Sequence, residues 1–155
     1  MPVQKLKDFL DDHGTKYITI RHSRAYTAQE TAQSAHVPGK ELAKTVMIKI
    51  DGAMAMVVLP GSERVDLAEL KRATGAGRVE LATEAEFKRL FPDCEVGAMP
   101  PFGNLYGMDV IASSKLAEDA EIAFNAGSHT ELIRMGYKDF ERLVKPKVAQ
   151  IAYGE

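Results

Sequence analysis

The sequence predicts a mixed α/β fold, in which a curled, partly barrel-like mixed sheet carries helices packed on its outside. Segments with apolar residues at helical spacing alternate along the chain with short segments whose apolar residues alternate as in strands. A hairpin is prominent among the strand-like segments, and the regular strand–helix–strand repeat of a parallel sheet is absent. A Rossmann or TIM-barrel layout is therefore not expected.

The first forty residues predict two helices with a strand between them. Apolar residues recur at helical spacing over 3–10, and Gly14 follows as a helix stop. The segment 16–20 (KYITI) alternates as a strand does. A capping box at 27–30 (TAQE) then begins a second helix, because its threonine hydroxyl and glutamate carboxylate can satisfy free amides. That helix should end before Pro38.

The clearest local signal is a β-hairpin that follows the second helix. Two apolar segments, 44–50 (KTVMIKI) and 53–59 (AMAMVVL), flank the dipeptide Asp51-Gly52. Asp-Gly between two such segments favours a tight two-residue turn, because both residues tolerate a positive φ. The sequence therefore predicts two paired antiparallel strands joined at this turn.

The rest of the chain continues the mixture of short helices and strands. Helices are predicted at 66–73 and 83–90, each opened by a capping residue with a glutamate three positions later, and a strand at 78–82 lies between them. The uncharged segment 97–107 (GAMPPFGNLYG) interrupts the pattern. Beyond it, the expected elements are strands at 108–113, 121–127 and 130–135, a helix at 137–144 and a last extended piece at 147–152.

Length and composition predict one globular domain over residues 1–155. A chain of this size can bury roughly 70% of its unfolded surface, and 45% of its residues are hydrophobic. The one cysteine, Cys94, excludes an internal disulfide framework and fits the reducing cytoplasm. The N-terminus lacks the apolar region of a signal peptide, and the longest apolar run, 53–59, is too short to cross a membrane. We therefore expect a soluble cytoplasmic protein with no membrane partner.

The charge balance argues against a protein that coats nucleic acid. Lysine and arginine number 20 and aspartate and glutamate 22, which gives a net charge of -2 and a pI of about 6.1. Binding along a DNA duplex rests on many phosphate contacts, so no general DNA binding is expected. A small basic pocket for one nucleotide end is compatible with the same balance.

Metal sites and covalent nucleophiles find little support in the sequence. The four histidines show no ligand spacing and Cys94 has no partner cysteine, so no metal or other cofactor is expected. A single cysteine fits a packed small hydrophobe better than a nucleophile. Ser128 and His129 are adjacent, and neighbours on a strand point to opposite faces, which is poor geometry for a catalytic dyad.

Three features nevertheless suggest a pocket. Lys44 is either a solvated lysine at a strand edge or a charge held at a pocket mouth to meet a phosphate or carboxylate. The segment 97–107 is either a rigid surface loop or a wall of exposed backbone. Pro100 and Pro101 would stiffen it, and their peptide bonds permit the cis form. A second glycine turn, 125–130 (NAGSHT), presents a serine and a histidine. On pattern alone these features do not name a ligand.

Five blocks of sequence, taken in order, resemble the YbaK / prolyl-tRNA-synthetase-associated editing family. The blocks are HSRAYTAQE (22–30), ELAKTVMIK (41–49), LFPDCEVGAMPPFG (90–103), YGMDV (106–110) and FNAGSHTELIRM (124–135). The resemblance implies that family's fold and the activity of a freestanding aminoacyl-tRNA deacylase, which hydrolyses the ester joining a wrong amino acid to the 3′ end of a tRNA, typically one for proline. It also implies a metal-free site, the aminoacylated tRNA end as partner, and prolyl-tRNA synthetase as a further candidate partner.

The resemblance also assigns roles to residues of this sequence. Lys44 matches the family's lysine before the strand, and Gly97 matches the glycine that opens its G-x-x-P loop. His129 belongs to the segment that matches the family's glycine–histidine turn, and these three are the expected catalytic residues. Lys44 would anchor the terminal phosphate or polarise the ester, and backbone amides from Gly97 to Gly103 would hold the developing oxyanion. The expected substrate-binding residues are Ser23, Thr45, Pro100, Pro101, Phe102, Gly103, Gly127 and Ser128.

Two questions stay open at this level. Members directed at alanine commonly have asparagine after the lysine, whereas Thr45 follows it here, so alanine, cysteine, serine and threonine are all candidate amino acids. The alternative function is a non-catalytic module that binds a tRNA end or a nucleotide in association with a synthetase. Retention of Lys44 together with both glycine turns favours catalysis.

Overall fold

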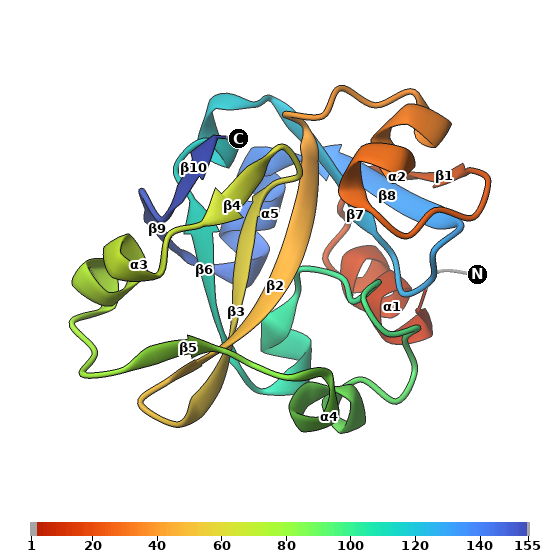
Figure 1. Cartoon of the computed structure of the whole chain (residues 1–155). Helices are drawn as coiled ribbons and strands as arrows, with labels where there is room; N and C mark the ends of the chain where they lie inside the picture. Colours follow the sequence, from red (N-terminus) through yellow and green to blue (C-terminus); the bar gives the residue numbers. More distant parts are fainter. Residues whose placement is uncertain (1–2, 155) are drawn as a thin grey trace.

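The computed structural model describes residues 3–154 and confirms the mixed α/β fold (Figure 1). Its α-helices are α1 (Gln4–Asp12), α2 (Ala28–Ala35), α3 (Leu67–Thr74), α4 (Glu84–Phe87) and α5 (Tyr137–Val144), with short 3₁₀ helices at Lys88–Leu90, Gly103–Tyr106 and Leu116–Glu118. Its strands are β1 (Tyr17–Arg21), β2 (Leu42–Ile50), β3 (Ala53–Pro60), β4 (Glu63–Val65), β5 (Val79–Leu81), β6 (Asp109–Ser113), β7 (Glu121–Asn125), β8 (Glu131–Gly136), β9 (Lys147–Ala149) and β10 (Ala152–Gly154). No helix within this range is long and apolar enough to cross a membrane.

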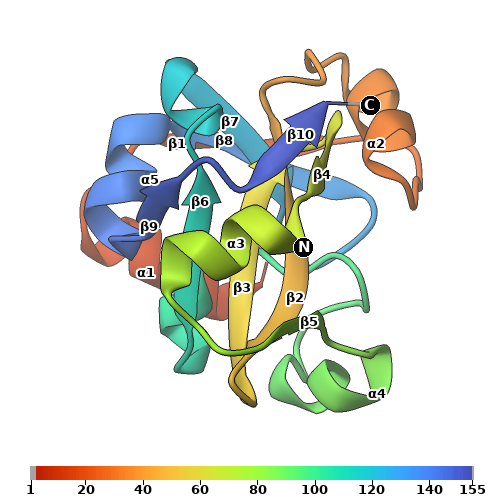
Figure 2. The same cartoon turned by 60° about the vertical axis from the view of Figure 1, so that its left-hand side comes forward.

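Eight strands form one curled, mixed sheet. Seven of them follow the order β1-β8-β7-β2-β3-β6-β9, and β5 pairs with one end of β2. The pairs β2/β7, β3/β6 and β6/β9 are parallel, and the others are antiparallel. Figures 1 and 2 show α1 and α5 on one side of the sheet and α3 on the other, where β4 and β10 form a separate ribbon. Helices thus cover both faces of a sheet of mixed direction.

Side chains of the central strand β3 alternate between two cores. Met56 and Val58 pack into the core beneath α1 and α5, which contribute buried residues such as Phe140. Val57 lies on the opposite face, in a smaller core with Leu70 of α3. A strand that is buried on both faces reads as a continuous apolar run, which explains the uninterrupted hydrophobicity of this segment.

The local signals of the sequence are confirmed. Thr27 and Glu30 form the reciprocal capping box at the start of α2, and Thr83 and Glu86 form another at α4. Asp66 caps α3 by accepting two hydrogen bonds from backbone amides of its first turn. β2 and β3 pair in antiparallel register around the predicted Asp-Gly turn.

Three details differ from what the sequence suggested. The segment 147–152 is not one extended piece, because β9 joins the main sheet whereas β10 pairs with β4. Ser128 and His129 lie in a turn, since β7 ends before them and β8 begins after them. The bonds that involve Pro100 and Pro101 are trans, as no peptide bond in the described range is cis.

Candidate active site

A fork in the sheet creates the cavity in which several candidate residues meet. β2 pairs with β7 only at Leu42–Ala123 and Ala43–Phe124, and its pairing with β5 begins at Ile48. Between these two pairings the edge of β2 pairs with neither strand, and a cavity of about 180 Å³ opens there. This fork cavity is lined by Tyr26, Thr27, Ala28, Leu42, Ala43, Lys44, Thr45, Gly97, Met99 and Asn125.

Lys44 and Thr45 line the fork cavity as neighbours on β2. Strand alternation places Thr45 on the face of Met47, toward the core under α1 and α5, whereas Lys44 shares the opposite face with Val46. The Lys44 ammonium donates to the carbonyl oxygen of Gly61 at 3.4 Å. This contact sets the direction of the cation at the cavity wall.

Main-chain hydrogen bonds join the two glycine turns that the sequence singled out. The Glu95 amide donates to the Gly127 carbonyl at 2.8 Å, and the Gly127 amide donates to the Ala98 carbonyl at 2.9 Å. Gly97 and Gly127 have φ values of 85° and 103°, a region that glycine adopts without the steric cost that a side chain brings. The two turns therefore form one unit, which places Gly97 at the cavity wall.

His129 lies behind Gly97 and is not among the lining residues of the fork cavity. Its side chain is buried, its amide donates to the Glu95 carboxylate at 2.7 Å, and its Nε2 donates to the Val96 carbonyl at 2.8 Å. The ring carbon Cε1 lies 3.5 Å from the position that a Cβ on Gly97 would occupy. Because a carbonyl oxygen only accepts, Nε2 donates this bond, which ties the His129 ring to the loop before Gly97.

Glu95 connects this unit to the neighbouring loop, and sequence reasoning did not select it. Its carboxylate accepts hydrogen bonds from the Arg24 guanidinium at 2.9 Å and from the His129 amide. The Arg24 bond, followed by the His129 bond, holds the pKa of Glu95 below its ordinary value. The only local signal was an acid two residues before Gly97, and nothing in the sequence indicated its two partners.

Four of the expected substrate-binding residues belong to the core. Pro100, Pro101, Phe102 and Gly103 are buried, and none of them lines the fork cavity. The Phe102 ring packs against the rings of Phe9, Phe124 and Phe140, with centroids 6.1, 5.5 and 5.7 Å away. Direct substrate contact by these four residues stays a prediction, and the structure gives them the task of anchoring the loop.

The remaining expected residues are also outside the cavity lining. Ser23 is exposed, and Gly127 packs so closely on Val3 that a Cβ there would lie 2.2 Å from a Val3 methyl group. The Ser128 hydroxyl lies 3.3 Å from the Thr130 hydroxyl and accepts a bond from the Thr130 amide. Ser128 and His129 therefore each bond other residues and make no dyad, because of their turn geometry and not because of strand alternation.

Two lining residues, Tyr26 and Asn125, were missed by sequence reasoning. Tyr26 is 68% exposed, and its ring centroid lies 4.8 Å from that of His129. The side-chain oxygen of Asn125 is buried and accepts no hydrogen bond from the described residues. An unpaired buried acceptor costs free energy, so this oxygen is suited to a donor that a ligand brings, such as an ammonium group. Both residues adjoin recognised motifs, but their convergence depends on the fork.

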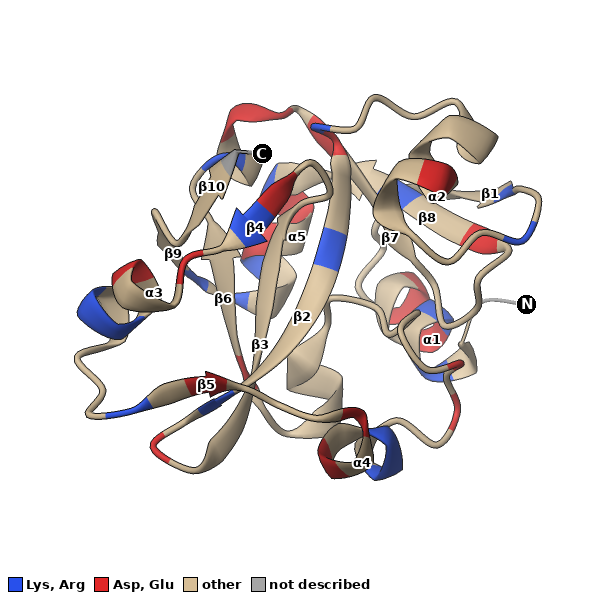
Figure 3. Ribbon diagram, in the orientation of Figure 1, with Lys and Arg blue, Asp and Glu red and all other residues tan. Residues whose placement is uncertain are grey.

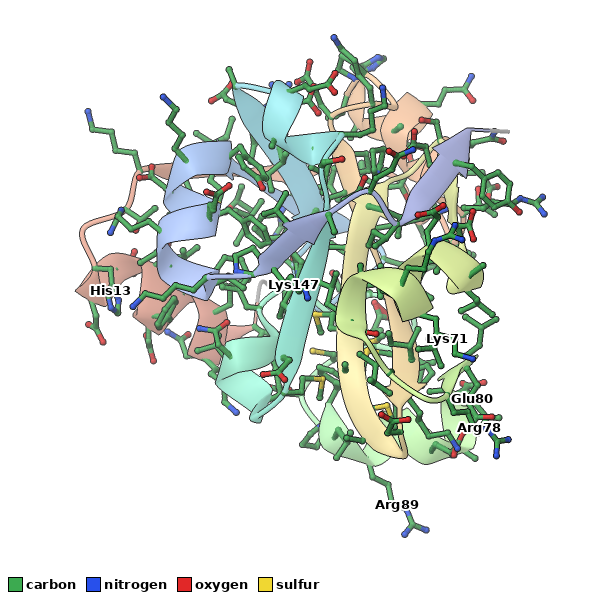
Figure 4. The ribbon with its side chains drawn as sticks, turned by 90° about the vertical axis from the view of Figure 1, so that its left-hand side faces the viewer. His13, Lys71, Arg78, Glu80, Arg89 and Lys147 are labelled. Carbon is green, nitrogen blue, oxygen red and sulfur yellow. The ribbon has the colours of Figure 1, made fainter. Side chains whose placement is uncertain are left out.

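Other candidate chemistry lies elsewhere. Burial, as the largest cause, raises the pKa of the Cys94 thiol to about 11, which disfavours the reactive thiolate. No three His, Cys, Asp or Glu side chains between residues 3 and 154 gather as a metal site. A larger hollow of about 450 Å³ is lined by Lys145 and by Lys147, which Figure 4 labels on another side of the molecule. None of the candidate catalytic residues lines that hollow.

The fork cavity can hold a small polar group that carries both a positive end and a developing negative charge. Its volume lies below the roughly 300–1,000 Å³ of drug-sized pockets, so it suits a group of few atoms. Lys44 and the Gly97 backbone can meet negative charge, and the Asn125 oxygen can accept from a cation. Within residues 3–154, no acidic side chain lines this cavity.

Comparison with known proteins places the chain in a family of aminoacyl-tRNA editing domains. The family model described as aminoacyl-tRNA editing domain matches residues 22–143. The chain is 26% identical over 150 residues to the multifunctional Ser/Thr-tRNA deacylase ProXp-y of Escherichia coli K12, covering 94% of this chain and 89% of that protein. It is 29% identical over 89 residues to a proline–tRNA ligase of Bacillus mycoides, covering 57% of this chain and 16% of the ligase.

Solved structures share the fold. The hypothetical protein APE2540 superposes with a TM-score of 0.87 at 20% identity, over 97% of this chain and all of that one. A candidate trans-editing enzyme for prolyl-tRNA synthetase superposes with a TM-score of 0.83 at 22% identity, over 98% of this chain and 97% of that one. At these identities the superpositions establish the architecture alone.

Proposed function

Because the chain belongs to the aminoacyl-tRNA editing domain family, we propose that it acts in trans as an aminoacyl-tRNA deacylase, which hydrolyses the ester between a wrongly attached amino acid and the 3′ end of a tRNA. The observation that carries the proposal is the meeting of Lys44, Thr45 and Gly97 around one small cavity. We further propose that the whole chain works as one editing domain, in the cytoplasm, where its substrate is made.

The physical need for such an enzyme is clear. A synthetase pocket gains only about 1–3 kcal/mol of discrimination per methylene, so small impostor amino acids are attached to tRNA and must be removed afterwards. A second, differently shaped site that accepts the impostor solves this problem. The small volume of the fork cavity supports that role here.

The proposed mechanism asks the protein for position and charge. An ester is already activated, and the terminal ribose brings a vicinal hydroxyl that can help to activate water, so no protein nucleophile is required. Lys44 is proposed to hold the terminal phosphate or to polarise the ester. The Ala98 amide is occupied by the Glu95 carbonyl at 3.0 Å, so we assign the oxyanion to the Gly97 amide. His129 then acts as a positioning residue behind Gly97.

We propose serine or threonine as the amino acid that is removed. Thr45 offers a hydroxyl at the cavity, and the buried Asn125 oxygen can accept a hydrogen bond from the α-ammonium group of the aminoacyl ester. The E. coli relative is named a Ser/Thr-tRNA deacylase, which supports this choice. Alanine and cysteine are the remaining candidates. The proposed tRNA is that for proline, and prolyl-tRNA synthetase is the proposed partner, because part of the chain matches proline–tRNA ligases.

Replacement of Lys44 tests the catalytic role. Lys44→Ala should reduce deacylation to below about 1% of wild type, while the thermal unfolding midpoint stays near that of wild type. Deacylation is measured as loss of labelled amino acid from tRNAs charged with serine, threonine, alanine or cysteine. Lys49→Ala is the matched control, because Lys49 lies on the same strand but pairs with Glu80 and Glu86 outside the cavity.

The same panel separates the proposed function from its alternative. Wild-type turnover by the Lys44→Ala variant would contradict the role assigned to Lys44. If wild-type protein removes no amino acid from any of the charged tRNAs faster than buffer does, the deacylase proposal fails. The chain would then be interpreted as a module that binds an aminoacylated or nucleotide end without cleaving it.

A further inference from the structure

A second hollow adjoins the fork cavity on the other face of β2. It has a volume of about 290 Å³, and its lining residues are Lys44, Val46, Arg64, Val65, Leu67, Leu81 and Tyr153. We call it the Tyr153 groove. Lys44 lines both hollows, so the two meet at this residue.

The Tyr153 groove gathers apolar side chains that a folded protein usually covers. Leu81 and Tyr153 are 56% and 50% exposed, and Leu67 is 37% exposed. These residues come from β5, from the first turn of α3, and from β10, which is distant in sequence from the other two. A contiguous apolar patch of this kind marks a surface that binds something.

Charged side chains of the Tyr153 groove are basic. Among the described residues, its charged lining residues are Lys44 and Arg64, in a chain whose net charge is -2. Figure 3 shows basic residues on both β2 and β4 on the side of the molecule that faces the viewer. Arg64 is the cross-strand neighbour of Tyr153 in the β4/β10 ribbon. An exposed aromatic ring flanked by cations is the combination that binds single-stranded nucleic acid, by stacking on the base and by attraction to the phosphate.

We propose that the Tyr153 groove binds the terminal nucleoside of the tRNA whose amino acid enters the fork cavity. This inference rests on the proposed deacylase function. The base would lie against Tyr153 and Leu81, and the ribose that carries the ester would lie at Lys44, where the two hollows meet. Every tRNA ends in the same adenosine, so one fixed nucleoside site serves any tRNA and leaves amino-acid selection to the fork cavity.

Strand geometry supports this division of the substrate. Thr45 and Lys44 are consecutive residues on β2, about 3.3 Å apart along the strand, and they face opposite sides of it. Lys44 shares its face with Val46, which lines the Tyr153 groove, whereas Thr45 lines only the fork cavity. An ester bond is short, so its acyl and ribosyl ends need two adjacent hollows of this kind.

Tyr26 is the competing position for the base. It is exposed, and it lines the fork cavity directly. Its ring already has one aromatic neighbour, the buried ring of His129 with centroids 4.8 Å apart, although Tyr26 is more exposed than Tyr153, at 68% against 50%. The Tyr153 groove offers several apolar side chains around an aromatic ring instead of one lip residue. The structure therefore favours Tyr153, and Tyr26 becomes a comparison in the test.

The test compares two esters that differ in the nucleoside. Tyr153→Ala should lower kcat/KM for seryl-adenosine by about 5- to 100-fold, the cost of losing one base–aromatic stack. It should leave kcat/KM for the seryl ester of methyl β-ribofuranoside, which keeps the ribose and its vicinal hydroxyl but has no base, unchanged. Tyr153→Phe, which keeps the ring, should stay close to wild type on both esters. Ile18→Ala, which removes an exposed apolar side chain from β1, controls for surface truncation.

Two outcomes would overturn the proposal. One is an equal change, or no change, for both esters in Tyr153→Ala. The other is a loss confined to seryl-adenosine in Tyr26→Ala and absent from Tyr153→Ala.

A binding measurement separates this proposal from the deacylase function. Titration of wild-type protein with adenosine, followed by NMR, should shift the amide signals of Val46 and Leu81 and leave that of Ile18 in place. Shifts at the groove without hydrolysis of any ester would support the groove and reject the deacylase function. Hydrolysis of the esters without shifts at the groove would support the deacylase function and reject the groove as the nucleoside site.

Discussion

The uncharged segment 97–107 divides into two parts that do different work. Gly97 and Met99 line the fork cavity, and Gly97 is exposed. Pro100 to Gly103 are buried, and Phe102 packs at the centre of an aromatic cluster. The first part therefore forms a cavity wall, whereas the second fastens that wall to the core beneath α1 and α5.

The comparison shows why an uncharged loop can be both exposed and rigid. A wall of backbone amides stabilises a transition state only if its position is fixed before the reaction. The segment obtains this from the buried Phe102 on one side and from the Gly127 turn and His129 on the other. The whole segment is uncharged, so charge does not distinguish the part that forms the cavity wall from the part that anchors it.

Phe102→Ala should have the largest effect and should act on stability. Removal of a fully buried phenylalanine typically costs about 3–5 kcal/mol, and Phe102 is 0% exposed. For a chain of this length we expect the thermal unfolding midpoint to fall by roughly 6–20 °C. The measurement is thermal unfolding, together with deacylation at a temperature where the variant is folded.

The control for Phe102→Ala is a substitution of an exposed residue in the same segment. Asn104→Ala removes an exposed side chain from the same segment and should leave both quantities near wild type. If Phe102→Ala kept the wild-type unfolding midpoint and still lost as much deacylation as a variant of the wall itself, the division into wall and anchor would be wrong.

Gly97→Ala should have the next largest effect and should act on catalysis. Alanine at φ 85° costs about 1–2 kcal/mol, and the backbone can relieve this strain by turning the amide away from the cavity. Steric crowding is not the cause, because the nearest atom, Cε1 of His129, would lie 3.5 Å from the new Cβ. Loss of one oxyanion donor lowers kcat by about 100- to 1,000-fold.

Gly107 supplies the matched control for that substitution. It has φ 73°, a Cβ added to it would meet no atom within 4 Å, and it has no place in the fork cavity lining. Gly107→Ala should therefore lose similar stability and keep wild-type kcat. Equal losses of kcat in Gly97→Ala and Gly107→Ala would show that the effect comes from strain in the segment and not from the wall.

Local patterns predicted most of the fold because each depends on neighbours in sequence. The capping boxes at Thr27 and Thr83 and the Asp-Gly hairpin are each defined by a short stretch of chain, and all are present. Separation of the final extended piece into β9 and β10 was not predictable in the same way. It depends on which distant strand each half meets.

The same distinction between local and long-range signals applies to the candidate site. Lys44, Thr45 and Gly97 were selected from the sequence, and the structure brings them to one cavity. Tyr26 and Asn125 were not, because their place in the lining results from the point at which β2 and β7 separate. That point is set by packing across the whole sheet, and no short segment encodes it.

Glu95→Gln should have the smallest effect and should depend on pH. The Arg24 and His129 hydrogen bonds lower the pKa of Glu95 in the folded protein, so its charge adds stability above the unfolded pKa of about 4.3. That contribution is lost as the pH falls through the lower, folded pKa. Glutamine keeps an acceptor for the His129 amide but removes the ion pair with Arg24, which is partly exposed and therefore weak. At pH 7 we expect the unfolding midpoint of Glu95→Gln to lie about 1–3 °C below wild type.

The pH dependence of that difference shows whether charge or hydrogen bonding holds the wall in place. The difference in unfolding midpoint should shrink toward zero at a pH below the folded pKa of Glu95, where the wild-type carboxyl is protonated as well. Glu95→Ala, which removes the acceptor of the 2.7 Å bond from the His129 amide, should remain less stable than Glu95→Gln at every pH. A gap between wild type and Glu95→Gln that does not change with pH would mean that the ion pair with Arg24 contributes nothing, and that the wall depends on the His129 bonds and the core anchor alone.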